Sequence, residues 1–127
     1  MKKLVVFAAL LIGLISVPVP AQTPSAAIAP ATVIHIINVK WKEDATPEQI
    51  QAALDAVRQL PARFPGMKHV WTKDIKYQGQ EGYKQAIVME FENQDALKKY
   101  EDSAAQQWWY KLYLPVRDES RTHDVTN

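Results

Sequence analysis

The sequence contains no cysteine, which excludes disulfide bonds, cysteine-ligated metal centres and a lipid-modified N-terminal cysteine. Glycine is also scarce, with four residues in 127, and none of them builds a glycine-rich phosphate-binding loop. The three histidines, His35, His69 and His123, are far apart, and no histidine and carboxylate have the spacing of metal ligands. We therefore expect no metal ion and no cofactor.

The chain also lacks an excess of charge of one sign. It has 15 lysine and arginine residues and 14 aspartate and glutamate residues, a formal net charge of +1. Nucleic-acid binding depends on a basic stripe or patch, and the sequence has none. We therefore expect no nucleic-acid partner.

One hydrophobic run is present, and it lies at the N-terminus. Two lysines precede the apolar segment Leu4–Val17, and a valine and an alanine occupy the small-residue cleavage positions before Gln22. The run is shorter than the roughly 20 residues of a transmembrane helix. Residues 1–21 are thus predicted to be a signal peptide, with an uncleaved anchor as the alternative. Cleavage would leave a periplasmic or secreted protein with no stable membrane span.

The mature chain is predicted to start with a flexible tether and to continue into one domain. Residues 22–32 are small and interrupted by prolines, with no periodicity, which is typical of a linker. Residues 33–127 then form the single domain. About 100 residues suffice for one hydrophobic core.

The first predicted strand is apolar on both faces. Val33, His35 and Ile37 alternate with Ile34 and Ile36. A strand that is apolar on both sides is normally covered on both sides. This pattern predicts a sheet with helices on one face and a partner molecule on the other. Ile34, Ile36, Ala86 and Val88 are the residues expected on the partner-facing side.

The rest of the domain alternates between helical and strand patterns. Thr46 and Gln49 predict a capping box, the segment Leu60–Gly66 predicts the end of that helix, and Ser103 begins a further helix. The remaining predicted elements are strands over residues 67–77, 83–92 and 119–126, a hairpin connection over 78–82, and a helix capped by Asn93. The order is β-α-β-β-α-β with the second helix broken. It predicts an α+β, ferredoxin-like fold.

Several segments resemble the stress-responsive α/β barrel domain family. They are VIHIINVKWK, ATPEQI, PGMKHV, GYKQAIVMEFEN and LKKYEDSAAQQ. The resemblance implies a dimeric α/β barrel and hence a homodimer. It also implies a link to a plant polyketide cyclase that uses three histidines and a tyrosine. The matching positions here are His35, Gln85, Tyr100 and Gln106, so two of the three histidines are replaced by glutamine.

Six residues are the candidates for a ligand-binding site, and two of them, His35 and Tyr100, are also the catalytic candidates. The six are His35, Gln85, Tyr100, Gln106, Trp71 and Trp109. Each also has a structural interpretation. His35 and Gln85 could be buried partners of one another, and Tyr100 could be a core residue. Gln106 could serve only to cap the helix that starts at Ser103, and the tryptophans could pack in the core or at a dimer seam.

Three functions agree with these residues. The first is an exported dimer that binds a small apolar or aromatic molecule in a stress response. The second is a cofactor-free cyclase or oxygenase acting on a phenolic or polyketide-like substrate, with His35 as base and Tyr100 as acid. The third is a structural stress protein without a ligand. A general base must titrate near the working pH, and histidine is the one residue type among the four matched positions that suits this role.

Overall fold

The computed structural model describes residues 31–76 and 80–126. Within these ranges no helix is long and apolar enough to cross a membrane. The expected signal peptide and residues 22–30 of the expected tether lie outside the described residues. The elements are β1 (Val33–Trp41), α1 (Pro47–Val57), α2 (Leu60–Arg63), β2 (Met67–Asp74), η1 (Gln80–Gly82), β3 (Gln85–Phe91), α3 (Gln94–Tyr100), α4 (Ala104–Tyr113) and β4 (Arg117–Val125).

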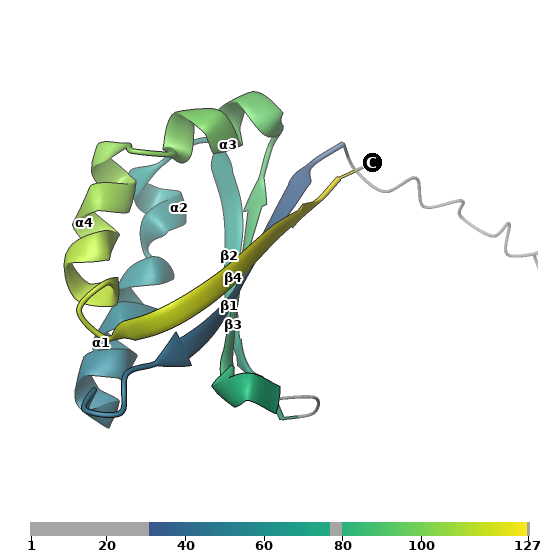
Figure 1. The fold of residues 1–127 in the computed structure, drawn as a ribbon. Coiled ribbons are helices and arrows are strands. Elements are labelled where there is room, and N and C mark those ends of the chain that lie inside the picture. Colours follow the sequence, from purple (N-terminus) through teal and green to yellow (C-terminus); the bar gives the residue numbers. More distant parts are fainter. Residues whose placement is uncertain (1–30, 77–79, 127) are drawn as a thin grey trace, which may run out of the picture.

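The four strands form one antiparallel sheet in the order β2-β3-β1-β4 (Figure 1). On the central strand β1, Ile37 lies opposite Ile87 of β3 and Thr122 of β4. The helices cover one face of this sheet and leave the other bare. The predicted ferredoxin-like α+β fold is confirmed.

Local capping explains where the helices begin. The Thr46 hydroxyl accepts a hydrogen bond from the Gln49 amide at 3.2 Å, and the Gln49 side chain accepts one from the Thr46 amide at 2.9 Å. The Asn93 side chain caps α3 in the same way. The predicted break in the second helix lies at Asp102, whose positive φ of 60° is incompatible with a continuing right-handed helix. Ser103 then caps α4.

Several boundaries differ from the sequence prediction. The segment predicted to end the first helix forms α2, because Pro61 occupies its first turn, where proline is tolerated, and Leu60 is fully buried. Strand β2 stops at Asp74, three residues early. Strand β4 starts at Arg117, two residues early, and is nine residues long because it pairs with β1 along its length.

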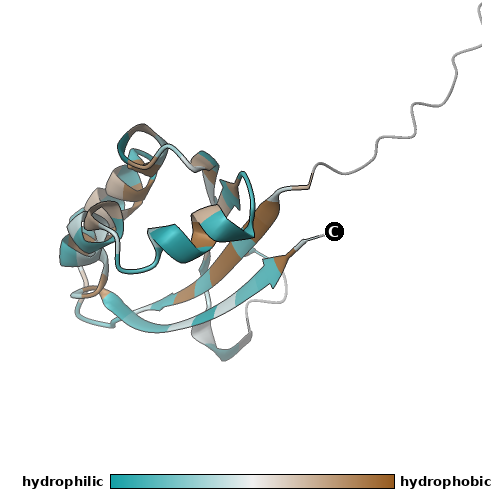
Figure 2. Ribbon diagram, turned by 90° about the horizontal axis from the view of Figure 1, so that it is seen from above, coloured by the Kyte–Doolittle hydropathy of each residue, from teal (hydrophilic) through white to brown (hydrophobic). Residues whose placement is uncertain are grey.

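The two faces of the sheet differ in what covers them. The helix-covered face holds the core, in which Val39, Ile87 and Met89 are completely buried. The bare face carries partly buried apolar side chains in the middle of the sheet, on β1 and β3, and the exposed Trp71 on β2. Figure 2 shows the contrast between hydrophobic β1 and the more hydrophilic edge strand β4. The predicted apolar residues of β1 and β3, Ile34, Ile36, Ala86 and Val88, all lie on this bare face.

Candidate functional site

His35 lies on the helix-covered face of β1, directly opposite Asp124 of β4. His35 Nδ1 and Asp124 Oδ1 are 2.6 Å apart. An ionised carboxylate can only accept a hydrogen bond, so Nδ1 carries the proton and donates it. The neutral imidazole then has its lone pair on Nε2, which can accept a hydrogen bond or a proton. The carboxylate thus fixes both the tautomer and the orientation of the histidine.

His35 borders a cavity of about 230 Å³ between the sheet and the two C-terminal helices. Strands β1 and β4 supply its sheet side, and α3, α4 and the loop between them supply the rest. Its lining is mixed, with apolar walls and several side chains that can form hydrogen bonds. The lining residues are His35, Ile37, Leu97, Tyr100, Glu101, Gln106, Tyr110, Tyr113, Arg117, Ser120 and Thr122.

Tyr100 is the most deeply buried polar group of this cavity. It ends α3, is 1% exposed, and packs against Phe64 and Phe91, with ring centroids 5.6 Å and 5.2 Å away. Its hydroxyl has no hydrogen-bond partner among the described residues. Burial raises the pKa of Tyr100 well above its usual value, so the phenol stays protonated and can donate. An unpaired buried hydroxyl costs free energy, which a ligand acceptor would recover.

Arg117 brings a cation to the cavity. It begins β4, and its Nη1 donates to Ser120 Oγ at 3.2 Å, while its Nε is buried with no partner among the described residues. Its guanidinium carbon lies 5.6 Å from the ring centroid of Tyr113. Burial raises the pKa of Tyr113, and the nearby Ser120 and Arg117 side chains lower it by a smaller amount. The Tyr113 hydroxyl makes no well-oriented hydrogen bond with a described residue. Sequence reasoning missed Arg117, because β4 is polar on both faces and shows no alternation to single out one side chain.

Gln106 takes part in the helix cap and also lies at the cavity wall. Its backbone amide donates to the Ser103 hydroxyl at 3.2 Å, and its side-chain oxygen accepts from the Asp102 amide at 2.7 Å. Ser103 therefore caps α4 as predicted, but the reciprocal half of the capping box is absent, because the Gln106 side chain accepts from Asp102 and not from Ser103. Gln106 is also buried and lines the cavity beside Tyr100.

The other three candidates lie outside the cavity, so the predicted six-residue cluster divides. Gln85 is 5% exposed and lies on β3 between Val39 of β1 and Asp74 of β2. Its neighbour Val39 is two residues along β1 from Ile37, which lines the cavity. Its amide is therefore not a partner of His35, contrary to the paired arrangement considered from the sequence.

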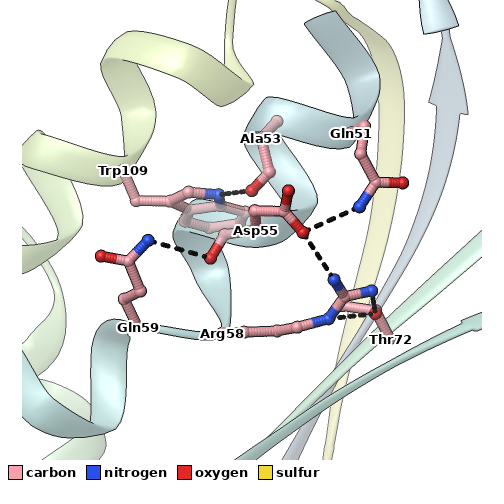
Figure 3. Close-up of polar contacts among 7 residues, drawn as sticks. All are labelled: Gln51, Ala53, Asp55, Arg58, Gln59, Thr72 and Trp109. Atoms are coloured by element: carbon pink, nitrogen blue, oxygen red, sulfur yellow. Dashed lines mark hydrogen bonds and ion pairs between the residues drawn. The ribbon is translucent and has the colours of Figure 1, made fainter. Parts of the chain in front are cut away.

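The two tryptophans lie outside the cavity for different reasons. Trp109 is 1% exposed, and its indole Nε1 donates to the Ala53 carbonyl at 3.1 Å (Figure 3). It stacks on Tyr113, which lines the cavity, at a centroid distance of 4.2 Å, but it does not itself line the cavity. Trp71 lies on the bare sheet face, 44% exposed, stacked on His69 at 5.3 Å. Strand parity places it there, since it pairs with Val88.

The family model of the stress-responsive A/B barrel domain, Dabb, matches residues 33–127. The chain belongs to this family. A dimeric ferredoxin-like protein of unknown function from Thermobifida fusca is 20% identical, with 76% of this chain and 91% of that chain covered and a TM-score of 0.65. No curated protein sequence matches the chain.

Two enzymes share the fold of this Dabb protein at low identity. Hydroxynitrile lyase from Passiflora edulis is 17% identical over 77% of this chain and 94% of its own, with a TM-score of 0.69. A cofactor-independent oxygenase from Streptomyces nogalater is 10% identical over 76% and 93%, with a TM-score of 0.62. Similarity at this level establishes the fold alone.

The site of the Dabb protein has the parts that proton transfer to and from a small organic molecule requires. His35 with Asp124 can take up a proton, Tyr100 can donate a hydrogen bond to a ligand oxygen, and Arg117 can steady a negative charge. Among the described residues, no group of three or more histidine, cysteine or acidic side chains could hold a metal ion. The arrangement therefore suits hydrogen-bonding recognition or acid–base chemistry by side chains.

Proposed function

We propose that this Dabb protein binds a small aromatic or phenolic molecule in the cavity bordered by His35 and Tyr100. The observation that carries the proposal is the unpaired, buried hydroxyl of Tyr100, a residue that lines a cavity also bordered by an oriented histidine. The cavity volume is below the range of drug-sized sites, about 300–1,000 Å³, and above that of a benzene-sized void, roughly 150 Å³. A compound of one or two rings fits this size.

The polar groups of the cavity match both the donor and the acceptor function of a phenol hydroxyl. The lone pair on His35 Nε2 accepts the hydrogen bond of a ligand hydroxyl, because Asp124 holds the proton on Nδ1. The Tyr100 hydroxyl donates to a ligand oxygen. Ile37 and Leu97 supply apolar wall for the ring. A hydrocarbon of the same shape would leave both polar groups unpaired, so the site should prefer the phenol.

Isothermal titration with phenol and 4-ethylphenol, and with toluene as the hydroxyl-free control, tests this proposal. His35→Gln should weaken phenol binding by about 1–2 kcal/mol, the value of one buried hydrogen bond, or roughly 5- to 30-fold. His69→Gln, on the opposite sheet face, is the matched control and should leave binding unchanged. Native mass spectrometry of protein isolated from its own cell envelope would show whether a small molecule co-purifies. Equal affinity for phenol and toluene, with no effect of His35→Gln, would contradict the proposal and favour a purely structural protein.

A second candidate function, base catalysis without a cofactor, is favoured by the 2.6 Å contact between His35 and Asp124. A carboxylate behind a histidine stabilises the imidazolium that forms when the ring takes a proton. Arg117, a cation that the sequence did not reveal, could balance the negative charge left on the substrate. Multiple turnovers of a phenolic or polyketide-like substrate, lost in His35→Gln and reduced in Asp124→Asn, would establish this function in place of simple binding.

We also propose that the protein is exported and forms a homodimer through its bare sheet face. Ile34, Ile36 and Val88 lie on that face with no cover from the chain's own helices (Figure 1). Apolar surface of this kind on a sheet is usually buried against a partner. Solved structures of the same fold are described as dimeric. Export rests on the sequence of residues 1–21, which lie outside the described residues.

A further inference from the structure

Arg117 forms no ion pair with a described residue, in contrast to Arg58 and Arg121. Arg58 pairs with Asp55 at 2.8 Å, and Arg121 pairs with Glu81 at 2.7 Å. Within residues 31–76 and 80–126 no carboxylate lies within ion-pair distance of Arg117, whose polar neighbours are the neutral hydroxyls of Ser120 and Tyr113.

Burial makes this lack of a counter-charge significant. Arg117 is half-buried at the cavity wall, and its Nε has neither protein partner nor solvent exposure. A guanidinium keeps its charge at all ordinary pH values, so it cannot avoid the cost of burial by losing a proton. Partly buried charges are normally paired, and Arg117 lines a cavity with room for an anion.

The other charges around the cavity do not supply that anion. Glu101 lines the cavity, but it is an exposed residue whose charge is solvated, and it forms no ion pair with Arg117. Asp124 is engaged by His35. The tyrosines Tyr100, Tyr110 and Tyr113 all have a pKa raised above the usual value by burial, so they stay neutral.

We infer that the cavity selects a small aromatic carboxylate, with Arg117 as the residue that recognises its anionic group. The inference rests on the proposed function and names the class of its ligand. The planar fork of a guanidinium matches a carboxylate, which can accept two parallel hydrogen bonds from it. Within a half-buried site such bonds are stronger than those to a neutral amide. The ligand's ring would occupy the apolar part of the cavity, and a ring hydroxyl would reach His35 or Tyr100.

The test compares 4-hydroxybenzoate and 3-hydroxybenzoate with the corresponding hydroxybenzamides, which have nearly the same shape and no charge. Isothermal titration at neutral pH should show that the wild type binds the better carboxylate about 10- to 100-fold more tightly than its amide. Arg117→Gln should remove that preference while retaining amide binding. Arg117→Lys keeps the charge without the fork, so it should retain part of the preference, and it also tests whether loss in Arg117→Gln reflects misfolding.

Arg121→Gln is the matched control, because Arg121 is on the same strand but its guanidinium pairs with Glu81 at the surface. It should keep the full carboxylate preference. Equal binding of acid and amide by the wild type, or a preference that survives in Arg117→Gln, would overturn the inference and leave the proposed function intact. Absence of binding by phenol and by all four hydroxybenzoic compounds would instead overturn both.

Discussion

The core position of Trp109 gives a sharp prediction, because an adjacent tryptophan serves as its control. Trp109→Phe removes the indole N–H that donates to the Ala53 carbonyl (Figure 3). It also replaces the ring stacked on Tyr113 by a smaller one. Trp108→Phe changes a half-buried ring whose main recorded contact is the guanidinium of Arg63, 3.6 Å from the ring centroid. The two substitutions are chemically identical and differ in burial.

The expected magnitude follows from these contacts. The buried hydrogen bond contributes about 1 kcal/mol. The smaller phenyl ring leaves unfilled space where the indole was buried, at about 0.8 kcal/mol for each CH₂-sized group lost. Together these give about 2–3 kcal/mol for Trp109→Phe. The exposed cation–π contact of Trp108 is worth about 0.5–1 kcal/mol, so Trp108→Phe should cost no more than that.

Urea unfolding followed by far-UV circular dichroism measures both changes without relying on tryptophan fluorescence. In thermal unfolding, Trp109→Phe should lower the melting temperature by about 10 °C or more, since 1 kcal/mol corresponds to roughly 4–8 °C in a domain of this size. If Trp109→Phe cost no more than Trp108→Phe, the indole would not be a core contact, and its assignment outside the ligand cavity would fall. A loss of phenol binding without a loss of stability would refute the reasoning in the same way.

Three further predictions concern the bare sheet face, the acid stability and the N-terminus. Ile36→Lys should dissociate or unfold the dimer, whereas Gln107→Lys on the exposed side of α4 should not; light scattering that gives a monomer mass for the wild type at micromolar concentration would contradict the dimer. The hydrogen bond from His69 lowers the pKa of the Glu90 carboxyl. Its stabilising effect is therefore present above the unfolded-state pKa of about 4.3 and is lost as the pH falls through the lower folded-state value. Glu90→Gln should reduce the loss of stability on acidification, measured by urea unfolding from about pH 7 to about pH 3, and an unchanged pH profile would argue against the pair. Mass analysis of protein from its own host should give Gln22 as the N-terminal residue, and an intact Met1 on membrane-bound material would indicate an anchor instead.

Much of the fold was predictable because its signals are local. The capping residues Thr46, Asn93 and Ser103 begin helices where expected, since a cap needs only backbone groups two or three residues away. Strand alternation also placed Ile34 and Ile36 on one face and His35 on the other. The short helix α2 was missed, because its stability comes from burying Leu60 against the rest of the core, which no local rule reports.

The candidate site depended on contacts that are distant in sequence. Alternation and family resemblance identified His35, Tyr100 and Gln106, which do border the cavity. Asp124 was missed, because 89 residues separate it from His35 and only the pairing of β1 with β4 brings the two together.

The sequence by itself determined the order of the strands and of the three capped helices, the starts of those helices and the face of β1 on which the histidine lies, because these depend on chemistry within a few residues. The tertiary structure decided which polar groups share a cavity. Strand register joined Asp124 to His35, and packing on Tyr113 with a hydrogen bond to Ala53 placed the Trp109 indole in the core. The edge position of β4 brought Arg117 to the cavity wall. Register and packing arise from the whole set of nonlocal contacts, so no single segment of the sequence specifies them.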